Sequence, residues 1–141
     1  MPRPPRPSEL ARRRAKNRAD DAARQYARAK YGYCVTCGAT GEGVVLQWAH
    51  LLPGGVEVTR YDKKNFAQQC SGCNMLHEHQ PQRYTLWFLH HYGLDAYEEL
   101  CAKHNVGMSG GNKMRTEDFI RIALDLEVRA RRLNDGERED G

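Results

Sequence analysis

The chain has 141 residues, of which 40% are hydrophobic and 28% are charged, and its formal net charge is +4. This length suits one small domain, and no apolar run approaches the roughly 18 residues that a membrane helix requires. The first residues carry arginines with no apolar segment behind them, which argues against a secretory signal. We therefore expect a non-membrane protein that stays in the cytoplasm, where cysteines remain reduced.

Positive charge is concentrated in residues 1–30, which hold ten Lys and Arg against three acidic residues, whereas residues 31–141 hold 12 against 15. The stretch from Ser8 to Lys30 is rich in Ala and Arg and lacks Gly and Pro, so it predicts a helix. Such a helix can follow a phosphate backbone through counterion release, and the alternative is a plain solvated helix. We predict that residues 1–30 form a basic arm whose DNA-binding side chains are Arg12, Arg13, Arg14, Lys16 and Arg18.

Two Cys-x-x-Cys pairs stand out in the middle of the chain, Cys34 with Cys37 and Cys70 with Cys73. Each pair can present two thiolates to one ion, and four thiolates complete the tetrahedral shell of a structural zinc site. In a reducing compartment such pairs are metal sites or redox motifs, and a redox motif needs no second copy. We predict that the four cysteines bind Zn²⁺ and that the fifth, Cys101, is a small buried residue of a helix.

Between the cysteine pairs the sequence predicts a β-hairpin. Residues 44–50 read as a buried strand, residues 53–55 break the chain, and residues 56–60 alternate as a second strand. His50 stands at the exit of the first strand, where an imidazole can act as the general base for phosphodiester hydrolysis. We predict His50 as this base and Asn65 as the residue that holds the loop orienting its ring. A structural histidine and an ordinary turn asparagine are the alternatives.

A helix is expected to begin near Cys73 or Asn74. On that helix Asn74 and His77 are three residues apart and share a face, so an amide oxygen and an imidazole nitrogen can reach one cation opposite His50. Mg²⁺ keeps most of its waters and needs few protein ligands. We predict that Asn74 and His77 hold a catalytic Mg²⁺ or Mn²⁺, the alternatives being a helix cap and a surface residue.

The C-terminal part is predicted to be helical. Residues 81–92 form a buried helix ended by Gly93, residues 95–104 form another, and residues 105–113 are a flexible connection. Thr116 is expected to cap a last helix, with a charged, disordered tail over residues 135–141. An apolar stripe on the last helix should pack on the domain or on a second subunit, and it consists of Phe119, Ile122, Ala123, Leu126, Ala130 and Leu133.

These elements predict a small α+β protein. Its core over residues 31–93 is a zinc-stapled β-hairpin plus helix, the ββα-metal arrangement. Additional helices precede it within residues 1–30 and follow it over residues 94–134.

Several blocks between Cys34 and Leu133 form a recognisable pattern. They are Cys34-x-x-Cys37-Gly38, then Gln47-Trp48-Ala49-His50, then Arg60-Tyr61-x-x-x-Asn65-x-x-x-Gln69-Cys70-x-x-Cys73-Asn74, then Tyr84 and Gly93. These blocks resemble the NinG/Rap recombination proteins of lambda-like bacteriophages. The resemblance implies a His-Asn-His-type nuclease with structural zinc, encoded by a phage or prophage and active in a bacterial cell.

The resemblance also implies cutting of branched DNA such as D-loops and Holliday junctions. It carries base, support and metal-ligand roles to His50, Asn65 and Asn74. Related sites often bear an acidic residue near the histidine, where this chain has Gln47, Trp48 and Ala49. That ligand is either missing or supplied from elsewhere, with Asp62 as the candidate.

The predicted function is therefore a metal-dependent, structure-specific DNA endonuclease of the HNH type. Two alternatives stay open: a zinc-containing DNA-binding module of phage recombination without catalysis, and a zinc-knuckle adaptor for a recombination or packaging partner. Symmetric junction cutting would suit a homodimer, but no residue proves one.

Overall fold

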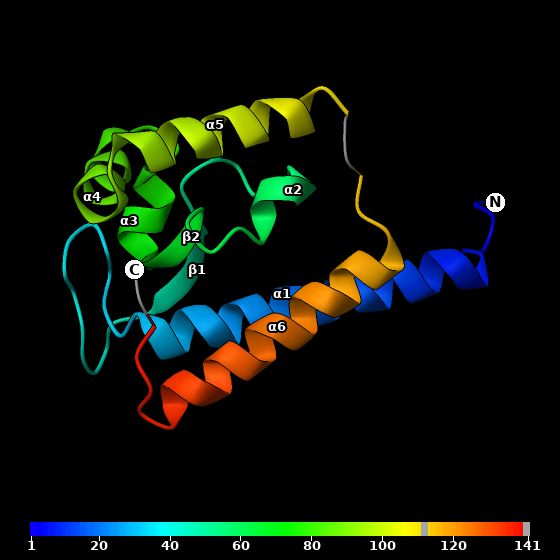
Figure 1. Ribbon diagram of the computed structural model, residues 1–141, viewed down its shortest axis with the longest axis horizontal. Coiled ribbons are helices and arrows are strands. Elements are labelled where there is room, and N and C mark those ends of the chain that lie inside the picture. The colour runs from blue at the N-terminus through cyan, green and yellow to red at the C-terminus, as the bar shows by residue number, and fades with distance from the viewer. Residues whose placement is uncertain (111–112, 140–141) are drawn as a thin grey trace.

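The computed structural model describes residues 1–110 and 113–139. In these ranges the protein is a small α+β structure with a two-stranded antiparallel sheet and six helices. The pair α1 (Pro7–Lys30) and α6 (Thr116–Asn134) lies on one side of the sheet (Figure 1). The helices α3 (Ser71–Leu76), α4 (Gln82–Tyr92) and α5 (Leu94–Met108) lie on the other. None of the helices in the described ranges is long and apolar enough to cross a membrane.

The helix α1 is a structural half of the core rather than a detached arm. Pro7 stands in its first turn, where no intrahelical N–H is needed, and the Glu9 carboxylate accepts the Arg6 N–H at 3.0 Å. Small side chains at helical spacing let α6 approach α1 closely from Ala15 to Ala27. The buried side chains of α1 are Ala15, Ala19, Ala22, Ala23, Tyr26 and Ala27.

The helices α1 and α6 run parallel (Figure 1), and polar contacts link them near their middle and at their C-terminal ends. Arg18 pairs with Glu127 at 2.8 Å, and Tyr26 donates to Glu139. Glu139 also pairs with Arg129 at 3.1 Å and lies 3.6 Å from Lys30. The prediction of a disordered tail is therefore wrong up to residue 139, because this carboxylate is held by three partners, while residues 140–141 lie outside the described residues.

The sheet pairs β1 (Leu46–His50) with β2 (Phe66–Cys70), so that Leu46 faces Cys70 and His50 faces Phe66. Side chains alternate along each strand. Trp48 and Phe66 pack on the α1–α6 side, whereas Ala49 lies in a second cluster with side chains of α4 and α5. The sheet thus has a hydrophobic cluster on each face.

The predicted second strand over residues 56–60 is wrong, because these residues form the short helix α2 (Glu57–Arg60). Val56 and Val58 pack against Gly107 of α5, where an added Cβ would lie 2.5 Å from either valine. The Thr59 hydroxyl lies 2.7 Å from Nδ1 of the buried His104. Contacts with α5 therefore replace strand pairing, and β2 takes the place beside β1.

Several helix ends differ from expectation. Cys70 caps α3, since its sulfur accepts the Cys73 N–H at 3.5 Å. The helix α4 ends at Gly93 as predicted, with φ of 91°. The helix α5 continues to Met108, past the expected start of the connection, part of which (111–112) lies outside the described residues. Arg115 rather than Thr116 caps α6, and its N–H donates to Asp118 at 2.8 Å.

Candidate zinc site and the surroundings of His50 and Asn74

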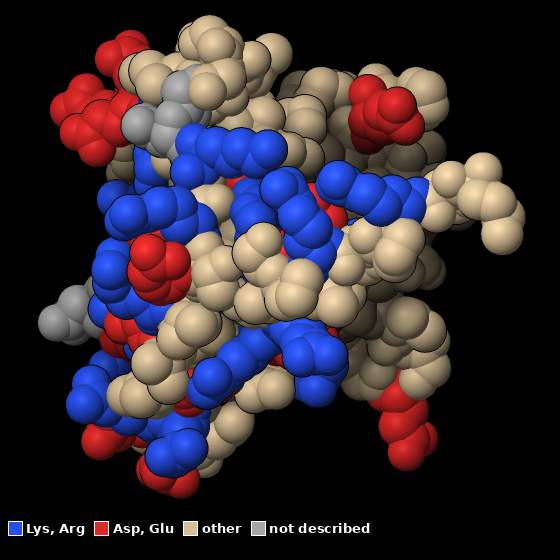
Figure 2. Space-filling view, turned by 90° about the vertical axis from the view of Figure 1, so that its right-hand side faces the viewer, with Lys and Arg blue, Asp and Glu red and all other residues tan. Residues whose placement is uncertain are grey.

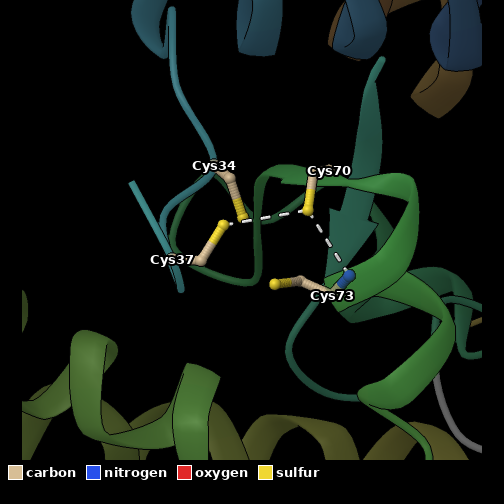
Figure 3. A group of neighbouring side chains, drawn as sticks. All are labelled: Cys34, Cys37, Cys70 and Cys73. Carbon is tan, nitrogen blue, oxygen red and sulfur yellow. Dashed lines mark hydrogen bonds between the residues drawn. The ribbon is translucent and has the colours of Figure 1, made fainter. Parts of the chain in front are cut away.

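Four cysteine sulfurs meet where the loop after α1 approaches β2 and α3. Cys34 and Cys37 lie in that loop, Cys70 ends β2 and Cys73 lies on α3, and their side chains point toward one another (Figure 3). All four Sγ atoms lie within 4.8 Å of one another, and those of Cys37 and Cys70 are 3.8 Å apart. A tetrahedral ion with Zn–S bonds of about 2.3 Å separates its sulfurs by about 3.8 Å, so this cysteine quartet fits zinc.

The surroundings of Cys34 favour its thiolate, whereas hydrogen bonds to neighbouring cysteines and burial raise the pKa of Cys37 to about 11. Gly38, at φ 79°, donates its N–H to the Cys34 carbonyl at 2.8 Å and closes the first knuckle. Burial raises the pKa of the Cys34 thiol, but hydrogen bonds from the Thr36 hydroxyl and from backbone N–H groups outweigh burial and lower the pKa to about 6. The thiolate is the form that binds metals.

Within the described part of the chain, the cysteine quartet is the only group of three or more His, Cys, Asp or Glu side chains close enough to hold one ion. Cys101 lies on α5, half-buried and outside this group. The predicted clustering of the four cysteines is confirmed, and the cluster could bind zinc.

His50 ends β1 with one ring nitrogen fixed by the backbone. Its Nε2 donates to the Arg60 carbonyl at 3.0 Å, so the neutral ring carries its proton on Nε2 and leaves Nδ1 as an acceptor. Burial is the main cause that lowers the pKa of His50 to about 4, because burial and the Arg60 guanidinium together outweigh the hydrogen bond to the Arg60 carbonyl and the Asp20 carboxylate, which act in the opposite direction. His50 is therefore neutral at physiological pH. In the described ranges Nδ1 has no hydrogen-bond partner, yet it is not fully buried.

Asn65 holds the loop that follows His50. The side chain is fully buried, and its Oδ1 accepts the Leu52 N–H at 2.8 Å. Its Nδ2 donates to the carbonyls of Leu52 and Thr59 at 3.1 and 3.0 Å. The amide thus ties both ends of the loop to the start of β2, which places the carbonyl of Arg60 next to His50.

Three residues around His50 were missed by the sequence interpretation. Arg60 pairs with Asp20 of α1 at 2.9 Å and donates to the Gly54 carbonyl at 2.9 Å, which links α1, α2 and the loop. A Cβ at Gly54 would lie only 2.8 Å from His50 Nδ1, so the backbone passes directly over the ring. An acidic residue within a basic, alanine-rich helix was the available signal for Asp20.

Asn74 and His77 each form a hydrogen bond, Asn74 with a residue of β1 and His77 with the residue that follows β1. Asn74 Nδ2 donates to Gln47 Oε1 at 2.9 Å. His77 Nε2 donates to the Leu51 carbonyl at 2.8 Å, and its Nδ1 is buried without a partner among the described residues. Nδ1, the ring nitrogen of His77 that is not engaged in a hydrogen bond, is therefore buried in the protein.

The hydrogen-bond partner of Asn74 on β1 lies on the face opposite to His50. Strand alternation places Gln47 and Ala49 away from Trp48 and His50, and Asn74 bonds to Gln47. Asn74 lines a cleft, and His50 is not among the residues that line it. Ala49, which precedes His50, is buried, and Asp62, the acid predicted from the sequence as a further ligand, is engaged with Lys103 at 3.0 Å. The side chains of Asn74, His77 and Asp62 are thus each engaged within the protein, and the cation site that they were predicted to form stays a prediction.

The basic residues predicted to bind DNA differ in their surroundings. Arg12 pairs with Glu57 at 2.8 Å, Lys16 lies 3.8 Å from the same carboxylate, and Arg18 is bound to Glu127. Arg13 and Arg14 are exposed. Figure 2 looks onto the end of the molecule where α1 begins, and it shows Asp and Glu side chains among the Lys and Arg side chains of that face. Much of the charge at this end is thus locally balanced.

The fold and the cysteine quartet define a small α+β protein with a four-thiolate site that could hold zinc. A family model described as the bacteriophage lambda NinG protein matches residues 10–137. This match spans nearly the whole chain, and the protein belongs to the NinG family. No curated protein and no solved structure matches the chain.

Proposed function

We propose that the protein is a metal-dependent DNA endonuclease of phage recombination, with the cysteine quartet as its structural zinc site and His50 as its general base. The observation that carries this proposal is the state of His50: a neutral imidazole whose Nε2 is tied to the Arg60 carbonyl and whose Nδ1 can accept a proton. A positioned base of this kind accelerates hydrolysis by typically 10²–10⁴-fold.

The proposed chemistry divides between His50 and its supports. His50 Nδ1 takes a proton from a water molecule whose oxygen forms a bond to the phosphodiester phosphorus, while the bond from phosphorus to the leaving sugar oxygen breaks and that oxygen takes a proton from solvent. Asn65 keeps the loop in place through its three hydrogen bonds. A divalent cation would supply charge stabilisation on the phosphate, and among the described residues no group of three or more His, Cys, Asp or Glu other than the cysteine quartet is close enough to hold one. Asn74 and His77 are hydrogen-bonded to Gln47 and to the Leu51 carbonyl, so they take no part in the proposed proton transfer.

Family membership supports recombination as the context and branched DNA, such as D-loops and Holliday junctions, as the substrate class. The endonuclease would act in the cytoplasm of the bacterial host. A homodimer remains one arrangement for cutting a symmetric junction.

A second candidate is a zinc-containing DNA-binding module without catalysis. The buried Ala49, in place of an acid beside His50, favours it, as do the hydrogen bonds that occupy Asn74 and His77. This candidate keeps the cysteine quartet and the DNA partner but predicts no cutting.

The two candidates differ in a plasmid assay. Zinc-loaded protein is incubated with supercoiled DNA and Mg²⁺ or Mn²⁺, beside His50→Ala. The endonuclease proposal expects nicking by the wild type and at least a 100-fold slower rate for the variant with DNA binding retained. Binding by both proteins with no nicking by either would select the second candidate.

A further inference from the structure

Side chains from the C-terminal half of α1 and the start of β1 enclose a cleft. Its volume is about 350 Å³, and the side chains that line it belong to α1, the two strands and α3. They are Arg24, Arg28, Leu46, Gln47, Trp48, Gln68 and Asn74. The arginines and Gln47 are exposed, so the cleft opens to solvent.

The cleft is rich in hydrogen-bond donors. Arg24 and Arg28 are four residues apart on α1, so both guanidinium groups stand on one helix face. The Arg24 Cζ lies 5.3 Å from the centroid of the Trp48 ring, within the roughly 6 Å of a cation–π contact. Among the described residues its carboxylate partner is the exposed Asp21 at 3.1 Å, a surface pair that water screens.

Trp48 lines the cleft in contact with the Arg24 guanidinium. Its Nε1 is buried and has no acceptor among the described residues. The indole N–H is closed off from solvent and does not contact a bound polymer directly, so it serves as a reporter of changes in the cleft.

We infer that this cleft binds the phosphate backbone of DNA, with the exposed guanidinium groups of Arg24 and Arg28 on the phosphates. An open, donor-rich cleft suits a polymer backbone, because phosphate oxygens accept from arginines and side-chain amides alike. The assignment rests on the proposed function for its choice of DNA. It moves the main contact from the start of α1, where Arg12 and Arg18 are paired, to its C-terminal half.

The test is the salt dependence of DNA binding, measured with the zinc-loaded full chain and a 20-base-pair duplex without added Mg²⁺. Arg24→Gln/Arg28→Gln should weaken binding at least tenfold and reduce the slope of log K against log salt by about 1.8, because each phosphate contact contributes about 0.9. Arg121→Gln/Arg132→Gln on α6 removes the same charge outside the cleft and should leave the slope unchanged. Equal slope losses in both double variants would overturn the assignment.

A second readout follows the indole itself. In a Trp87→Phe background the remaining indole N–H signal in an NMR spectrum belongs to Trp48, and it should shift when the duplex is added. In Arg24→Gln/Arg28→Gln the shift should be lost at the same DNA concentration. A Trp48 signal that stays still while the wild type binds the duplex would refute the cleft.

The outcomes separate this inference from the endonuclease. Binding that depends on the cleft without any nicking would keep the inference and reject the nuclease. Nicking by the wild type, together with unchanged DNA binding in Arg24→Gln/Arg28→Gln, would keep the nuclease and reject the cleft as the DNA-binding site. A wild type that binds no DNA would reject both.

Discussion

The cysteine quartet and the surroundings of His50 show two ways in which a site is built. The quartet uses two local knuckles, and each brings its two sulfurs together over only four residues before the chain folds around them. His50 instead depends on the distant groups Asn65, Arg60 and Asp20 for its orientation. A site of local motifs can be inferred from spacing, whereas a site of single polar residues depends on which face of a strand each one occupies.

Breaking the cysteine quartet should have the largest effect. Structural zinc contributes about 10–16 kcal/mol of apparent binding free energy in small zinc-finger peptides, and that binding is coupled to folding. Cys73→Ser or zinc removal should therefore abolish cooperative thermal unfolding, measured by circular dichroism together with zinc content. Cys101→Ser is the matched control and should keep both the metal and the transition. Equal stability of the two variants would show that the quartet binds no structural ion.

Removing the amide of Asn65 should have the next largest effect. Asn65→Ala leaves an N–H and two carbonyls of the loop without their partner in a buried setting. At about 1 kcal/mol for each hydrogen bond, the free energy of unfolding should fall by about 3 kcal/mol in urea titrations. A loss below about 1 kcal/mol would mean that the loop is held by other contacts.

The backbone above His50 offers a more selective change. In Gly54→Ala the new Cβ would lie 2.8 Å from Nδ1, so the ring must move, whereas a Cβ at Gly55 meets nothing within 4 Å. We expect nicking to slow about tenfold in Gly54→Ala, equivalent to about 1.4 kcal/mol in the barrier, with DNA binding unchanged. Gly55→Ala should behave as the wild type. Similar rates for both alanine variants would show that the ring position does not matter.

The smallest expected effect concerns pH and stability. The pKa of His50 is about 4 in the folded protein, against about 6.5 in an unfolded chain. Between these values the unfolded state binds more protons, so stability falls as pH decreases. From pH 7.5 to 5.5 the wild type should lose about 1.3 kcal/mol more than His50→Gln in urea titrations. Parallel losses would show that the folded-state pKa of His50 is ordinary.

The sequence was enough for several elements because their signals are local. The helix from residue 82 to Tyr92 and its end at Gly93 follow from its apolar content and a glycine with positive φ, and the cysteine pairs predict their own clustering. The helix α6 follows from its apolar stripe. The burial of one face of α1 against α6 was not predicted, because the many arginines indicated an exposed arm. The alanines at helical spacing were the signal for that buried face.

Other features depend on contacts that no local pattern contains. Val56 and Val58 alternate as in a strand, yet packing on Gly107 makes their segment helical. The face of β1 that each polar residue occupies follows from the pairing of Leu46 with Cys70 rather than with residues 56–60. That pairing places Gln47, the hydrogen-bond partner of Asn74, on the face opposite to His50, which spacing along the chain could not reveal.

The most direct test of the account is single-turnover cleavage of a synthetic four-way junction by zinc-loaded wild type and His50→Ala, with Mg²⁺ or Mn²⁺ present and binding measured in parallel. The account predicts that both proteins bind the junction and that only the wild type cuts it at an appreciable rate, with a difference of at least 100-fold. Equal cutting by both proteins would contradict the role of His50, and the absence of cutting by a fully bound wild type would contradict the nuclease itself.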